Sequence, residues 1–234
     1  MTIGSALHPT ILNDGRLLFS SYESQGIRDR RLWGVWTIDP DGQNWAPFVS
    51  AMTSPNAYHF FTQVSSGEVV VEQYYNLNNN GFGALFALPA TPSNPNQPAF
   101  GSPDPDLNPG ILQTVNAAHG QTTFRDSFTP QGYYALTPMT HPGDSAAPEN
   151  PNGGPRVGKF THPSAAPHND VLVAWTQGPA NDLNRPTTLP YYDSGLYVID
   201  NMQPVNSPGE LKLIKNDPRY NDCLLYTSDA ADDW

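Results

Sequence analysis

The sequence is short of positive charge and of long apolar runs. Its 234 residues include 11 Lys and Arg but 22 Asp and Glu, which gives a formal net charge of −11 at pH 7. Nucleic acid is held mainly by clustered positive charge, so no nucleic-acid partner is expected. No apolar run approaches the roughly 20 residues of a membrane-spanning helix. The composition therefore predicts neither a nucleic-acid-binding protein nor a membrane span.

Catalytic motifs are also missing. The sequence has no Gly-x-Ser-x-Gly nucleophile motif, no phosphate-binding loop and no dinucleotide fingerprint. Its six histidines do not have zinc-ligand spacing, and the single cysteine, Cys223, excludes a Cys-x-x-Cys-His haem attachment motif. We therefore predict no metal and no cofactor within this chain, and the catalytic residues stay unassigned.

Helical periodicity is weak throughout. No stretch of ten or more residues has a clean helical period, and the nearest candidate is the short segment 207–215. In its place the chain carries 19 glycines and 25 prolines. Such a density of turn-forming residues favours many short strands joined by loops. The predicted fold class is all-β.

A unit of turn, strand, polar loop, strand and turn occupies residues 8–42. Asn13-Asp14-Gly15 predicts a tight turn, because Gly adopts positive φ readily and Asn and Asp tolerate it. Residues 16–21 predict a half-buried strand, and residues 32–38 predict a second one. The turn Asp39-Pro40-Asp41-Gly42 closes the unit.

The same unit recurs over residues 57–89. Its predicted strands are 58–64, 68–75 and 83–88, which are rich in β-branched and aromatic residues. The turn glycines of the two units, Gly15 and Gly67, are 52 residues apart. A period of ~40–50 residues is typical of the blades of a β-propeller.

A further clear unit begins at Val157. Residues 160–163 repeat the pattern of residues 7–9, and residues 170–175 repeat that of residues 16–21. Between the clear units, residues 124–137 form a degenerate unit with a strand at 133–136. The segments 90–123 and 138–155 are dense in Pro, Asn and Gly, so we expect long loops with little strand character there.

The repeat resembles a known family. A turn with Asp-Gly, a strand that ends in Phe-Ser-Ser and a strand that ends in Ile-Asp-x-Asp-Gly resemble the blade repeat of TolB-like, WD-type β-propellers. Residues 72–83, 158–164 and 178–181 are similar to the middle propeller domain of hydrazine synthase alpha-subunit-like proteins. The resemblance implies a truncated, partial propeller over residues 1–222, with three to four four-stranded blades of a ring of six to eight. Because blades bury their faces against neighbouring blades, two terminal faces would be open.

The last residues have a different character. Residues 223–234 resemble the translated end of a sequencing-library transposon adapter. This interpretation makes them a non-native tail and the chain a metagenomic fragment, so they are left out of the fold prediction. The alternative is an ordinary polar tail.

The resemblance implies a scaffold or interaction domain in a multidomain bacterial protein that is periplasmic or secreted. In that family the catalytic haems lie on other domains, so haem is expected only on neighbouring domains of this protein. The expected partners are other domains or subunits of the same complex. Two other roles stay open, namely a propeller that gates a peptidase domain and a TolB-like interaction module.

The alternative function is ligand binding or catalysis by residues that face the propeller channel. His59 lies in an aromatic strand just ahead of a turn, and His119 lies on the long loop, where functional residues are common. The Asn-rich loop 76–83 offers amide and backbone oxygens to calcium or to a polar ligand. The candidate ligand-binding residues are His59, Tyr74, Asn78, Asn80 and His119.

Two other histidines fit a different interpretation. His8 and His162 each precede a proline and fall at equivalent places in two units. A residue type that recurs with the repeat favours a structural role in the repeat over a catalytic one.

Overall fold

The structure is a computed structural model. It describes residues 6–22, 32–53, 57–74, 81–88, 113–117, 120–124, 134–140, 157–177, 193–219 and 222. Within these residues the regular structure consists of β-strands and three short 3₁₀ turns. No helix among them is long and apolar enough to cross a membrane.

Twelve of the strands form three four-stranded antiparallel sheets, and two more form a separate hairpin. Sheet A has the order β1 (Ala6–Ile11), β2 (Leu17–Tyr22), β3 (Leu32–Ile38) and β4 (Ala46–Thr53). Sheet B has the order β10 (Tyr134–Ala135), β7 (Ala84–Leu88), β6 (Val69–Tyr74) and β5 (Ala57–Gln63). Sheet C has the order β11 (Lys159–Ala165), β12 (Val171–Thr176), β13 (Ser194–Ile199) and β14 (Lys212–Lys215). The hairpin pairs β8 (Gln113–Ala117) with β9 (Gly120–Phe124).

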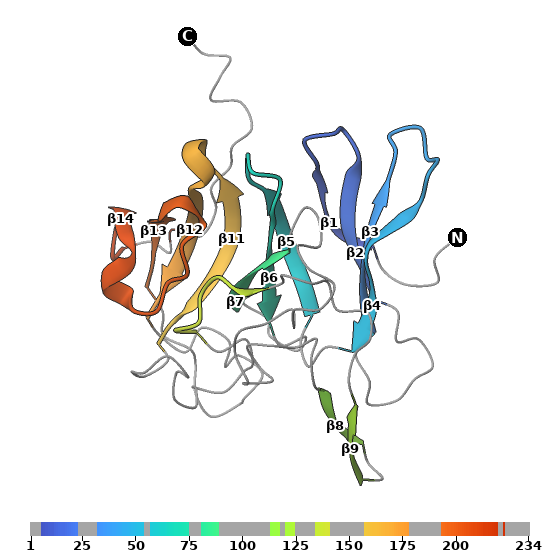
Figure 1. The fold of residues 1–234 in the computed structure, drawn as a ribbon. Coiled ribbons are helices and arrows are strands. Elements are labelled where there is room, and N and C mark those ends of the chain that lie inside the picture. Colours follow the sequence, from blue (N-terminus) through green and yellow to red (C-terminus); the bar gives the residue numbers. More distant parts are fainter. Residues whose placement is uncertain are drawn as a thin grey trace.

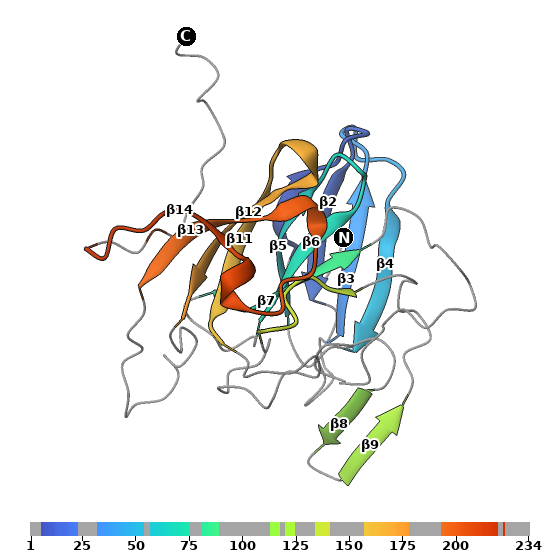
Figure 2. The same ribbon diagram turned by 60° about the vertical axis from the view of Figure 1, so that its left-hand side comes forward.

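The three sheets stand side by side in chain order (Figure 1). Neighbouring sheets approach each other at their first strands. The first strand of sheet B, β5, contacts both β1 of sheet A and β11 of sheet C. The hairpins that join the first and second strands all point the same way, and the β8–β9 hairpin lies apart from the sheets (Figures 1 and 2). In each sheet the other three strands follow outward from the first strand, so β1, β5 and β11 are the inner strands.

Sheet B is buried on both faces. Val69, Val71 and Phe86 belong to a core shared with Leu18 and Val35 of sheet A. The alternate residues of sheet B point to a second core, which is shared with sheet C; they include Val70, Leu85 and Ala87, and their partners include Phe160, Val171 and Val173. Successive side chains of a strand point to opposite faces, so a strand buried on both faces needs a continuous apolar run, as in Val69–Val71 and Ala84–Leu88.

The hairpin tips share one backbone conformation. Gly15 and Gly67 have φ of 88° and 93°, and Asn169 has φ of 62° at the equivalent place in sheet C. Glycine is favoured where the backbone is left-handed, and Asn is the usual substitute. The predicted turns at Asp14-Gly15 and Ser66-Gly67 are therefore present, and the third sheet uses Asn in place of Gly.

Hydrogen bonds join the tips of neighbouring sheets. The backbone N–H of Asn13 donates to Gln63 Oε1 at 2.7 Å. On the other side of sheet B, Ser65 Oγ and the Ser66 N–H donate to Asn169 Oδ1 at 2.8 and 2.7 Å. The three sheets are thus connected by polar contacts at their tips as well as by their cores.

The all-β prediction is confirmed, and so are strands close to the predicted segments in all three clear units. One loop prediction was wrong. The segment 90–123, predicted as loop, contains most of the β8–β9 hairpin, whose Val and Thr residues favour strands. The predicted strand at 133–136 is present as β10, but it belongs to sheet B, because Tyr134 and Ala135 pair with Ala87 and Phe86 at the edge of β7. Residues 212–215, at the end of the segment with the nearest approach to a helical period, form strand β14, in keeping with the all-β prediction.

Closure into a ring is not seen among the described residues, and none of the sheets closes on itself. The predicted non-native tail, residues 223–234, lies outside the residues that the structure describes.

Candidate functional site

The inner strands β1, β5 and β11 share an irregularity at one position. Each pairing with the second strand shifts register there, between Leu7 and Thr10 in sheet A and at the corresponding points in sheets B and C. The residues at the shift are His8, Phe60 and His162, with φ of 50°, 43° and 50°. A non-glycine residue with positive φ costs on the order of 1–3 kcal/mol. A cost that recurs in all three sheets indicates that the fold requires this bulge.

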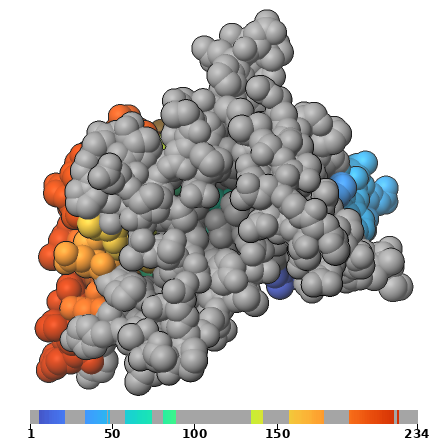
Figure 3. All heavy atoms as spheres, turned by 90° about the horizontal axis from the view of Figure 1, so that it is seen from below, coloured from blue at the N-terminus to red at the C-terminus, as the bar shows by residue number. Residues whose placement is uncertain are grey.

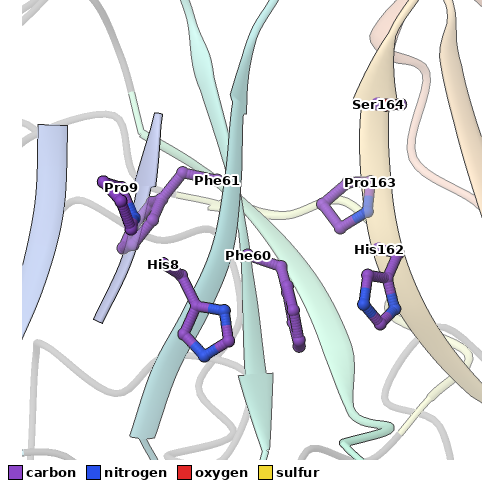
Figure 4. A pocket seen from close by; sticks show the side chains of 7 residues that line it. All are labelled: His8, Pro9, Phe60, Phe61, His162, Pro163 and Ser164. Atoms are coloured by element: carbon purple, nitrogen blue, oxygen red, sulfur yellow. The ribbon is translucent and has the colours of Figure 1, made fainter. Parts of the chain in front are cut away.

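The bulges place three aromatic rings in a row. The Phe60 ring lies between the His8 and His162 rings, with centroid distances of 4.1 and 3.9 Å (Figure 4). The row forms the floor of a hollow of about 180 Å³, whose other lining residues are Pro9, Phe61, Pro163 and Ser164. The hollow therefore lies across the inner strands of all three sheets.

The histidines at the row are held in their neutral forms. Burial, together with the neighbouring His8, whose ring centroid is 4.8 Å away, lowers the pKa of His59 to about 3. Burial also lowers the pKa of His8 and of His162. At neutral pH these imidazoles offer uncharged nitrogen atoms and ring faces rather than positive charge.

A buried acid lies behind the row. Glu72 on β6 is fully buried, and its Oε2 accepts from the His162 N–H at 3.2 Å and lies 3.0 Å from Thr161 Oγ1. Thr161 Oγ1 is also 2.6 Å from the Gly81 carbonyl oxygen. No hydrogen bond to Glu72 Oε1 is found within the described part of the chain. Burial raises the pKa of Glu72 well above its ordinary value.

The hydrogen bonds fit a neutral Glu72. A threonine hydroxyl has one proton, so Thr161 cannot donate to Glu72 and to Gly81 at once. When Glu72 is protonated, its own proton can be donated to Thr161 Oγ1, and the Thr161 proton is then donated to Gly81. His162 Nδ1 is 2.8 Å from the same hydroxyl oxygen and can donate to it, which leaves Nε2 as an acceptor. This network joins sheets B and C beside the ring row.

The structure brings together only part of the predicted site. His59 is 6% exposed and lies beside the row, whereas Phe60 takes the place that is equivalent to His8 and His162. Tyr74 ends β6, and its side chain is outside the described residues. The positions of Asn78, Asn80 and His119 also lie outside them. The ligand-binding role of these five residues stays a prediction.

Sequence reasoning missed Phe60, Glu72 and Thr161. Phe60 follows His8 by the same 52 residues that separate Gly15 and Gly67, so the repeat spacing could have found it. Thr161 is 89 residues from Glu72, and no local pattern marks their contact.

Comparisons with known proteins do not identify the site. No family model, no curated protein and no solved structure matches this chain. Among the residues that the structure describes, no group of three or more His, Cys, Asp or Glu side chains could hold a metal ion. The site is therefore interpreted from its own geometry.

Acid is expected to destabilise the protein through His59. Its folded pKa of about 3 lies below the ordinary value of 6.5, so the unfolded chain binds the proton more readily. Stability is then fully present above pH 6.5 and is lost as pH falls toward 3. Lowering the pH from 7 to 5 should cost about 2 kcal/mol from this residue. Urea unfolding at the two pH values measures the change.

Glu72 acts with the opposite sign, which provides a control. Its raised pKa favours the protonated folded state, so its contribution is present below the ordinary value of 4.5 and is lost as pH rises. Glu72→Gln removes this compensation, and the loss between pH 7 and 5 should grow. His59→Gln should remove most of the loss. Equal pH profiles for all three proteins would contradict the assignment.

Proposed function

We propose that this chain is a scaffold or interaction domain of the β-propeller type. The observation that carries the proposal is that the inner strands have the same arrangement in all three sheets. β1, β5 and β11 lie next to one another, bulge at the same position and begin sheets that pack face to face in chain order. In a propeller, the first strand of each blade lines the central channel and the blades pack against their neighbours.

The contacts between the sheets favour a scaffold role over a catalytic one. The buried core is shared between sheets, so each sheet is stabilised by its neighbours as in other repeat proteins. The resemblance to TolB-like propellers, and to the middle domain of hydrazine synthase alpha-subunit-like proteins, adds to the proposal. We place the domain in a multidomain, periplasmic or secreted bacterial protein whose catalytic groups, haem included, reside on neighbouring domains.

The genomic locus tests this proposal. We expect the reading frame to join this domain to another that carries its own catalytic set, such as a Cys-x-x-Cys-His haem motif. A Gly-x-Ser-x-Gly domain would favour the peptidase-gating alternative. A gene without any further domain would contradict the scaffold role, because there would be no neighbour to support.

A second candidate function is favoured by the hollow over the ring row. Its four rings, two prolines and the acceptor that we assign to His162 Nε2 fit a small uncharged ligand that donates hydrogen bonds. Neutral imidazoles also suit such a ligand better than an anion. Histidine NMR shifts measured against a panel of small polyols and amides test it, with His162→Phe as the matched variant. Binding that survives the variant, or no binding at all, would contradict this function.

A further inference from the structure

Each sheet has two faces, and both sheet-to-sheet contacts use them in the same way. The first face carries the residue that begins the second strand, namely Leu17, Val69 or Val171, and every alternate residue after it. The second face carries the residues between. At both contacts the second face of one sheet packs against the first face of the next sheet.

Among the described residues, the first face of sheet A is only partly buried. Phe19 and Trp36 lie opposite each other on β2 and β3, in the positions that Val71 and Phe86 occupy in sheet B. Val71 and Phe86 are fully buried, whereas Phe19 and Trp36 are partly exposed. Trp45 packs edge-on against both rings and is 43% exposed. This face carries the apolar pattern of a face that packs on a preceding sheet.

The second face of sheet C is partly exposed at several of its described residues, although Ala174, Thr176 and Ser194 on it are buried. Leu172 and Leu196 correspond to Leu18 and Val35 of sheet A by their places in the paired strands. Leu18 and Val35 are buried against sheet B, whereas Leu172, Leu196 and the neighbouring Val198 are partly exposed. On β12 and β13 this face carries the apolar pattern of a face that packs on a following sheet, whereas on β14 Lys212 and Lys215 lie opposite Val198 and Leu196.

The chain therefore holds both halves of its own sheet-to-sheet contact, one at each end. The coloured parts of sheets A and C lie at opposite sides of the molecule (Figure 3). We propose that two copies of this chain pair head to tail, the first face of sheet A in each copy packing on the second face of sheet C in the other. Two such contacts close a ring of six sheets. The inference rests on the propeller-type arrangement proposed above.

The pairing has a characteristic salt dependence. The apolar residues of the two faces carry no charge, Lys212 and Lys215 lie at the outer edge of the sheet C face, and each copy has a formal net charge of −11. Two such copies repel each other, and salt screens the repulsion. Raising the salt concentration should therefore strengthen the pairing, whereas contacts made by ion pairs would weaken.

Sedimentation velocity on the 234-residue chain, over a range of protein and salt concentrations, measures the association directly. We expect a dimer that becomes more stable with salt. Phe19→Asp in sheet A and Leu196→Asp in sheet C should each weaken the dimer at least about tenfold, as expected for a charge placed in an apolar contact. Leu213→Asp, at an outer-strand residue that is 59% exposed, is the matched control and should leave the dimer unchanged.

Mixing the two variants distinguishes head-to-tail pairing from pairing of like faces. Each variant alone lacks a good contact, but a mixture retains one contact between two intact faces, so mixed dimers should reappear. Like-face pairing predicts that only one variant loses the dimer, and this result would overturn the proposal. A monomer with normal β circular dichroism would overturn it too, as would open polymers, while leaving the scaffold role to be judged at the genomic locus. Circular dichroism and melting curves of each variant exclude unfolding as the cause.

Discussion

Phe86→Ala should lower the free energy of unfolding by about 3–5 kcal/mol, the usual loss when a buried phenylalanine is truncated to alanine. Phe86 is fully buried in the middle of β7, in the core that sheets A and B share. The surrounding side chains cannot move in to fill the cavity that the lost ring leaves, because sheet B is packed on both faces. Urea unfolding, followed by circular dichroism, should show a lower midpoint with an unchanged slope.

Trp36→Ala is the matched control, because Trp36 holds the position of sheet A that corresponds to Phe86. The side chain is larger but only partly buried, so its loss should cost less than half as much. The comparison is made at low protein concentration, where association of two copies does not contribute. Equal losses would mean that the first face of sheet A is covered as fully as the core, which contradicts the description of that face.

Much of the fold could be predicted because the local signals agree with the packing. Two local signals determine the hairpins: the glycine turns at Gly15 and Gly67 and the apolar runs of β6 and β7. The apolar runs also place side chains against the neighbouring sheets. The 52-residue spacing correctly indicated that sheets A and B are copies of one unit. β1 and β4 were not recognised as strands, since Pro9 and Pro47 interrupt their patterns. Only pairing with β2 and β3 makes them strands.

The candidate site was harder to predict, because it depends on contacts between sheets. The repeat correctly placed His8 and His162 at equivalent positions, but the residue before a proline is biased toward extended backbone. Their positive φ was therefore not foreseeable from Pro9 and Pro163. His59 was predicted as a site residue because an imidazole can bind ligands, although its neighbour Phe60 holds the repeated position. A repeat position is the better guide here than a residue type.

A second large effect is expected at Gly158, which lies just before β11 with φ of 69°. A Cβ atom there would meet the Thr176 carbonyl oxygen and the Trp175 indole ring well inside contact distance. The carbonyl oxygen belongs to the backbone of β12 and cannot move away without disturbing the sheet. Left-handed backbone costs alanine roughly 1–2 kcal/mol, and overpacking adds roughly 1–3 kcal/mol. Gly158→Ala should therefore destabilise the protein by about 2–5 kcal/mol in urea unfolding.

Gly42→Ala separates the two causes. Gly42 has φ of 82°, but a Cβ atom at this position would have no neighbour within 4 Å. Its substitution should show the backbone cost alone, about 1–2 kcal/mol. The difference between the two variants then measures how closely the chain before β11 approaches β12; β11 is the strand that carries Thr161 and His162. A difference near zero would mean that the chain before β11 lies farther from β12 than described.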